Sequence, residues 1–189
     1  FRRVLFRSKG IEPKIADKVF ELMAHFAGYG FNKSHSAGYA VLAYQTAWLK
    51  AHHPCEFLAA TLTSEMNNFD KLAVFLEECR RMKIGILPPD VNESGPVFTV
   101  VEGGIRFGLA AVKNAGRGAV DMIVEERSRK GPYRSLGDFI DRADSRAVNR
   151  RLLESLIFAG AFNSLGVRPE QLLAMLDPTV EACQRLAAE

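Results

Sequence analysis

The sequence predicts a mainly α-helical protein in which two helical lobes are joined by a small β-hairpin. Apolar residues recur at helical spacing through most of the chain, as in IADKVFELMAHFAG. Proline, glycine and other turn-forming residues are concentrated in ILPPDVNESGP, residues 86–96, where we place the main boundary. Only VFTVVEGGIRFGL, residues 97–109, has the pattern of two short strands about a Gly-Gly turn.

The first lobe is predicted to hold four helices. The first helix ends at Gly28, and the second begins near Ser36 and stops before Pro54, because proline does not continue a helix. The third follows Pro54 through EFLAATLTSEM, and the fourth, FDKLAVFLEECRRM, comes after a break at two asparagines. On the second helix Tyr44 and Trp48 are four residues apart, which favours a place in the core for both.

The second lobe is predicted to be helical again from Ala110 onward. Its helical segments are AVDMIVEERSR, SLGDFIDRA, AVNRRLLESLIFAG and RPEQLLAML. We therefore divide the chain into residues 1–90, residues 91–112 as a linker with the short β-hairpin, and residues 113–189.

Composition is that of an ordinary globular protein, with 48% hydrophobic and 25% charged residues among 189. The net charge of +3 permits a nucleic-acid partner without arguing for one. Cys55, Cys79 and Cys183 form no CxxC pair, so we expect neither a disulfide framework nor a zinc site. Reduced thiols are typical of the cytoplasm, where we expect this protein to be. No signal peptide and no apolar run of roughly 20 residues is present, so no membrane association is expected.

The stretch GYGFNKSHSAGYAVLAYQTAWLK places small polar and cationic residues at the start of an apolar helix. A helix start presents free backbone N–H groups and partial positive charge, which attract anions. Ser34 or Ser36 can cap this end, and Asn32, Lys33 and His35 add donors. These residues indicate a triphosphate cradle, although a helix cap with incidental polar neighbours explains them equally well.

A longer string, GYGFNKSHSAGYAVLAYQTAWLKAHHPCEFLAATLTSEM, resembles the fingers region of the bacterial family C replicative DNA polymerases, the alpha subunits of DNA polymerase III. The resemblance continues through EECRRMKIGILPPDVNES, IRFGLAAVKNAGRGAVDMIVEER, GPYRSLGDFIDR and VNRRLLESLIFAGAFNSLG, and so covers about residues 10–166. It implies that residues 1–90 are the end of the fingers and that FNKSHS holds the incoming nucleotide. FRRVLFRS does not resemble what precedes this region in the family, which indicates a truncated or foreign end.

The segment AAVKNAGRGAVDMIVEER has the pattern of a helix-hairpin-helix: an apolar helix end, a tight turn at Gly116–Gly118, and a second helix. Such a turn aims backbone N–H groups at a phosphate without reading bases, and we expect positive φ angles at its glycines. Lys113, Asn114 and Arg117 lie at the turn and would supplement the contact. A plain αα-turn is the commoner explanation of such a pattern, but the family resemblance favours binding to the DNA backbone.

VNRRLLESLIFAGAFNSLG followed by RPEQLLAML looks like a second, degenerate copy of this motif, with its turn at residues 160–166. Its glycine pattern is looser, so packing alone is left open as its role. Asp138, Asp141 and Asp144 alternate with arginines at helical spacing, which favours a salt-bridged, solvated face over a metal cluster. No catalytic or metal-binding residue is predicted in this chain.

The family resemblance implies a fragment of a DNA-directed DNA polymerase, without polymerase activity by itself. Mg²⁺ would be held by palm aspartates upstream of this region, and the substrates would be primer-template DNA and an incoming dNTP. The sliding clamp and other holoenzyme subunits would be further partners. A main replicase and an error-prone paralogue both stay open. So do a stand-alone, non-specific DNA-binding helical module, which leaves FNKSHS unexplained, and a helical scaffold without a ligand, which the modest net charge favours.

Overall fold

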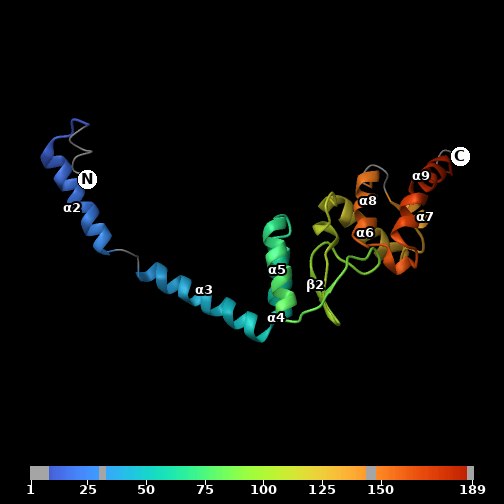
Figure 1. Ribbon diagram of the computed structural model, residues 1–189, viewed down its shortest axis with the longest axis horizontal. Helices are drawn as coiled ribbons and strands as arrows, with labels where there is room; N and C mark the ends of the chain where they lie inside the picture. The colour runs from blue at the N-terminus through green and yellow to red at the C-terminus, as the bar shows by residue number, and fades with distance from the viewer. Residues whose placement is uncertain (1–8, 30–32, 144–147, 187–189) are drawn as a thin grey trace. The chain divides into compact units, whose positions relative to one another are not determined.

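The computed structural model describes residues 9–29, 33–143 and 148–186. The protein is mainly helical with one small sheet, as the sequence predicts (Figure 1). The chain divides into two compact units, residues 1–48 and residues 49–189. Within the described ranges, none of the helices combines the length and the apolar character that a membrane span requires.

The first unit contains α2 (Pro13–Tyr29) and most of α3 (Lys33–His52). Proline suits the first position of α2, because the N–H that it lacks would have no helical partner there. Helix α3 begins at Lys33, ahead of the start predicted near Ser36. The core positions predicted for Tyr44 and Trp48 are wrong, since these side chains are 70% and 44% exposed.

The second unit opens with a helical pair, α4 (Pro54–Ser64) and α5 (Phe69–Arg81), as predicted. Helix α5 begins after Asn68, whose side chain accepts a hydrogen bond from the Lys71 backbone N–H and so satisfies one free donor of the first turn. Both helices pack on the sheet in one hydrophobic cluster. Its fully or almost fully buried members include Leu58, Leu62, Leu72, Cys79, Phe98 and Ile105.

The sheet has three strands, β1 (Ile86–Leu87), β2 (Thr99–Val101) and β3 (Gly104–Arg106), in the order β1-β3-β2. Strands β2 and β3 pair antiparallel, which confirms the predicted hairpin, and β1 adds a parallel edge that the sequence did not indicate. Gly104 has a φ of +145°, and a Cβ there would lie 2.0 Å from the Gly85 carbonyl oxygen. The turn and the close approach of β1 therefore both require glycine at this position.

The rest of the second unit is a cluster of helices gathered around a second hydrophobic core (Figure 1). They are η1 (Leu109–Ala111), α6 (Arg117–Lys130), α7 (Leu136–Arg142), α8 (Arg150–Phe158), η2 (Asn163–Leu165) and α9 (Pro169–Leu186). Phe139 and Phe162 meet edge to face at the centre of this core, with ring centroids 5.0 Å apart, and neither side chain is exposed. The core holds the described helices as one body.

The segment LPPDVNES, at the predicted boundary, lies inside the second unit and connects its two hydrophobic clusters. Val91 belongs to the cluster of α6–α9, whereas Phe107 packs against both clusters. Within the segment, Ser94 is fully buried: its hydroxyl accepts from the Asp90 N–H and donates to the Phe107 carbonyl. These bonds join the segment to the strand side of the unit.

Candidate nucleic-acid interface

The predicted hairpin before α6 is a short turn whose entry is one 3₁₀ turn, η1, in place of a longer first helix. The chain leaves η1 at Val112 and reverses at Asn114, which has a φ of +65°. Asparagine tolerates this left-handed conformation better than most residues do. Ala115 then turns inward to the core, and its N–H donates to the Val112 carbonyl at 3.0 Å.

The two glycines of the turn have ordinary backbone angles, so the expectation of positive φ at Gly116 and Gly118 is wrong. Gly116 precedes α6 with φ −63° and ψ 142°, and Gly118 lies in the first turn of the helix. A Cβ added at either glycine would meet no protein atom within 4 Å. Neither backbone strain nor internal packing explains these two glycines.

The N-terminus of α6 is open toward the same solvent. Gly116 provides no side-chain cap, and the first turn contains no acidic residue. The first helical bond runs from the Val120 N–H to the Gly116 carbonyl at 3.1 Å. The N–H groups of Arg117, Gly118 and Ala119 therefore have no partner within the helix, and the helix dipole adds positive potential at this end. This geometry suits a phosphate.

The three side chains predicted to assist the turn have different surroundings. Lys113 is exposed beside it. Arg117 is also exposed, and its Nε donates to both carboxylate oxygens of Asp121, at 2.8 and 3.0 Å. Such a surface ion pair is weak enough to exchange for a phosphate. Asn114 instead donates from Nδ2 to the Ser155 hydroxyl at 2.8 Å, so it fixes the turn against α8.

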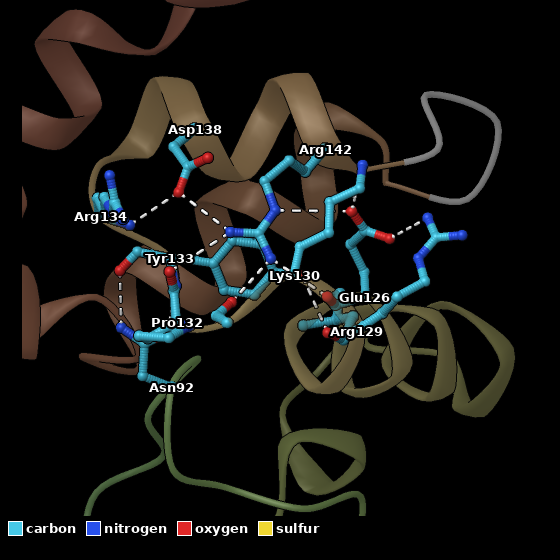
Figure 2. A network of polar contacts seen from close by, with 11 residues as sticks. Asn92, Glu126, Arg129, Lys130, Pro132, Tyr133, Arg134, Asp138 and Arg142 are labelled. Carbon is cyan, nitrogen blue, oxygen red and sulfur yellow. Dashed lines mark hydrogen bonds and ion pairs between the residues drawn. The ribbon is translucent and has the colours of Figure 1, made fainter.

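Helix α6 is held at its other end by Arg142 (Figure 2). Arg142 is one of the arginines between the three aspartates, and its side chain is mostly buried although a solvated face was expected. The guanidinium lies 4.3 Å from the centre of the Tyr133 ring and donates to the carbonyls of Gly131 and Glu126, at 2.8 and 3.2 Å. Gly131 directly follows α6, so no helical donor is available to its carbonyl, and Glu126 lies in the C-terminal half of the helix. The Tyr133 hydroxyl donates to the Ile123 carbonyl at 2.9 Å, further along the same helix.

Cationic side chains surround the Glu126 carboxylate at this end of α6. Lys130 and Arg129 lie 2.8 and 2.6 Å from its carboxylate oxygens, and Arg142 approaches at 3.6 Å (Figure 2). The contact with Lys130, followed by that with Arg129, lowers the pKa of Glu126 to about 2, against the opposing effect of desolvation. Asp138 takes the far side of Arg142 at 3.2 Å, which confirms the salt-bridged reading of this aspartate. Asp144 lies outside the described residues.

The LPPDVNES segment braces α6 from a second direction, through contacts that the sequence did not reveal. Arg127 donates from Nη1 to the carbonyls of Val91 and Ser94, at 2.9 and 3.0 Å. The Val91 N–H donates to the Ala161 carbonyl at 2.8 Å, so the same segment also joins the second hairpin. Because helix α6 is held along its length, its open N-terminus is presented from a fixed support.

The second hairpin-like copy is turned toward the core. Its helix α8 is capped by Asn149, whose side chain accepts from the Leu152 N–H at 3.0 Å. The turn that follows contains Gly160, with a φ of +81°, and the fully buried Ala161 and Phe162. In this turn glycine is needed for the positive φ angle, and the two residues after it pack in the core. These observations favour packing as the role of this second copy.

The other predicted site, at the start of α3, lies in the first unit. Lys33 is the first residue of the helix, and Ser34 and His35 follow in its first turn, where both are exposed. The two candidate caps, Ser34 and Ser36, thus lie inside the helix and not before it, and Asn32 lies outside the described residues. The His35 ring contacts Tyr39 with 4.5 Å between centroids. The first turn contains no acidic residue that would repel an anion.

Among the residues that the structure describes, no group of three or more His, Cys, Asp or Glu side chains is arranged to hold a metal ion. The described residues therefore do not fit a magnesium site. They do provide groups that attract anions: helix N-termini, exposed cationic side chains and exposed backbone N–H groups.

A hairpin with an exposed glycine turn at an uncapped helix start, followed by a second hairpin in the same core, defines a protein with a helix-hairpin-helix region. Residues 83–172 match the family model described as a helix-hairpin-helix motif. That range covers the sheet, the open turn and both hairpins.

Relatives identify the protein more closely. The chain is 49% identical to the DNA polymerase III subunit alpha of Thermus aquaticus over 97% of its length, and 45% identical to that of Escherichia coli over 94%. The identity to the Pseudomonas aeruginosa subunit is 48% over 93% of the chain. The chain belongs to the bacterial DNA polymerase III alpha subunit family. It spans about 15% of the length of each of these relatives.

Proposed function

We propose that this chain is the segment of a replicative DNA polymerase that binds the DNA backbone and helps to position the incoming nucleotide. The observation that carries the proposal is the open space at Gly116 and Gly118, for which the protein itself offers no structural reason. A strand of DNA brings a phosphate to that space, and the N–H groups at the start of α6 bind it without distinguishing between bases.

The side chains around the turn add charge to this contact. Lys113 supplies a mobile cation, and Arg117 can release Asp121 to bind a neighbouring phosphate. Because the contacts are to phosphates alone, binding is non-specific, and because they are few, binding is weak. It falls as salt rises, with a slope set by the number of phosphates that the hairpin contacts. The hairpin would thus hold the primer-template at any sequence, as a replicase requires.

The start of α3 would hold the triphosphate of the incoming dNTP. Lys33 and His35 are hydrogen-bond donors in the first turn of the helix, and the helix dipole adds positive potential at this end. In phosphoryl transfer such groups position the substrate and stabilise developing negative charge. Asn32 and Ser34 would complete the cradle.

The reaction of the whole protein is nucleotidyl transfer by a DNA-directed DNA polymerase in the cytoplasm. Mg²⁺ would be held by other parts of that protein, where it activates the primer hydroxyl and neutralises the leaving pyrophosphate. The sliding clamp and other holoenzyme subunits would likewise bind outside the residues described here. This segment contributes the binding and orientation of DNA and nucleotide.

Titration of labelled, unrelated DNA duplexes with the 189-residue chain tests the DNA-binding role. We expect dissociation constants on the order of 10⁻⁴–10⁻⁶ M at physiological salt, with no preference between duplexes. Lys113→Ala should reduce the slope of log K against log salt by about 1. Lys71→Ala, on α5 and paired with Glu65, serves as the matched control and should leave the slope unchanged. Affinity that is indifferent to salt would favour the scaffold reading instead.

A further inference from the structure

A shallow groove of about 540 Å³ lies between the hairpin and α8. Its lining includes Pro89, Phe107, Ala111, Lys113, Ser155 and Phe158. None of the described residues that line it is acidic. The groove therefore combines apolar walls with a single cation, Lys113, which also flanks the proposed phosphate-binding turn.

Phe158 is an anomaly on its helix. The apolar residues Leu152, Leu153, Leu156 and Ile157 of α8 are at most 2% exposed, whereas Phe158 is 74% exposed. Within the described part of the second unit, it is the most exposed of the large hydrophobic side chains. Large exposed aromatic rings beside apolar grooves are typical of binding surfaces.

The face of α8 that carries Phe158 runs beside the hairpin. Arg151, Ser155 and Phe158 follow one another at i, i+4 and i+7, so they lie along one stripe of the helix. Ser155 accepts the hydrogen bond from Asn114, which joins this stripe directly to the turn. Arg151 is exposed. The aromatic ring thus shares its stripe with one cation, and Lys113 and the open N-terminus of α6 lie on the hairpin to which this stripe is bonded.

We propose that this groove binds an unpaired nucleotide of single-stranded DNA, with the base stacked on Phe158 and its phosphate beside Lys113. An exposed ring flanked by cations is the combination that binds single strands without sequence preference. Bases in a duplex are already stacked and must be unstacked before a side chain can reach their faces. A single strand presents those faces freely. The proposal rests on the proposed DNA-binding function and extends it from duplex backbone to unpaired bases.

Charge distinguishes the possible occupants of the groove. A purely apolar protein segment would cover the groove and Phe158 but would make no use of the charges of Lys113 and Arg151. A polyanion uses both cations together with the ring. These features favour nucleic acid over a second copy of the chain or another protein.

The test compares a labelled oligothymidylate with a blunt duplex, each titrated with the full 189-residue chain at low salt. Phe158→Ala should weaken oligothymidylate binding by about fivefold to a hundredfold and leave duplex binding unchanged. Phe158→Trp should retain the affinity for the single strand. Phe158→Leu, which keeps apolar volume and removes the ring, should lose affinity as alanine does. Phe69→Ala, at a site 58% exposed on α5, is the matched control and should change neither affinity.

Each other outcome overturns the proposal. If Phe158→Ala leaves both affinities unchanged while duplex binding persists, the groove takes no nucleotide and the DNA-binding function still stands. If the wild-type chain binds neither probe, the proposed function itself fails. Single-strand affinity of Phe158→Leu equal to wild type would rule out stacking. Self-association of the wild-type chain that Phe158→Ala abolishes, with oligothymidylate binding unchanged, would assign the groove to a second copy.

Discussion

Asn92 and Tyr133 exchange two hydrogen bonds across 41 residues of sequence: the Asn92 Nδ2 donates to the Tyr133 carbonyl at 2.9 Å, and the Tyr133 N–H donates to the Asn92 Oδ1 at 2.7 Å. A primary amide is suited to this pairing, because it presents a donor and an acceptor side by side. This pair of bonds attaches the LPPDVNES segment to the loop that precedes α7. The Tyr133 side chain in that loop is the ring against which Arg142 packs (Figure 2).

Replacing Asn92 by alanine should destabilise the protein by about 2 kcal/mol, because both backbone groups of Tyr133 lose their partner in a half-buried position. Urea unfolding followed by circular dichroism measures the loss. Asn67→Ala, at an exposed position between α4 and α5, is the control and should remain within about 0.5 kcal/mol of wild type. Equal unfolding midpoints for the two variants would show that the pair contributes nothing.

Glu126→Gln should change how stability depends on acid. The folded protein lowers the pKa of Glu126 from 4.5 to about 2, so this carboxylate stabilises the fold above pH 4.5. That contribution is lost progressively as the pH falls from 4.5 toward 2. Denaturant unfolding at several pH values should therefore show a gap between wild type and Glu126→Gln that narrows in acid. Glu77→Gln, at an exposed carboxylate, is the comparison. A gap that is constant with pH would contradict the assignment.

Valine at Gly116 or Gly118 should preserve the fold and weaken duplex binding. The backbone at Gly116 has a φ of −63°, Gly118 is helical, and both face open space, so a side chain fits without strain. It would nevertheless occupy the space that a phosphate needs. Gly104→Ala is the opposite case and should destabilise the fold, since its Cβ would lie 2.0 Å from a carbonyl oxygen. Thermal unfolding and DNA titration of all three variants separate the two effects. Undiminished DNA affinity in both valine variants would remove the hairpin from the interface.

In the full-length polymerase, Lys33→Ala and His35→Ala should each impair nucleotide incorporation. Loss of one charge-assisted phosphate contact costs roughly 1.5–3 kcal/mol, which would appear in kcat/KM for the dNTP. Gln45→Ala, exposed on the same helix, provides the control. Unchanged single-nucleotide incorporation at low dNTP concentration in both variants would exclude a triphosphate site at the start of α3.

The 189-residue chain alone should not extend a primer, even with Mg²⁺, primer-template and all four nucleotides. The described residues contain no carboxylate arrangement that suits two metal ions, and Asp138 is held by Arg142. A primer-extension assay on protein purified free of host polymerase decides this. Primer extension by protein purified in this way would refute the proposal that the catalytic metal ions are held by other parts of the polymerase.

The sequence by itself determined the elements of this protein. Helices follow from apolar residues at helical spacing, and their ends follow from residues that cannot continue them, as at Pro54. The β2–β3 hairpin follows from its Gly-Gly turn. Family membership also followed from sequence, because strings such as FNKSHSAGYA and LPPDVNES are long enough to be specific.

The tertiary structure alone decided which residues meet and which remain exposed. Pairing of Asn92 with Tyr133, and the place of Arg142 against α6, depend on reversals of the chain that no local window contains. Helical spacing showed that Tyr44 and Trp48 share a face but not whether that face is covered. For the same reason, the sequence located the glycine turn but misjudged why it contains glycine: backbone angles and open space are properties of the folded chain.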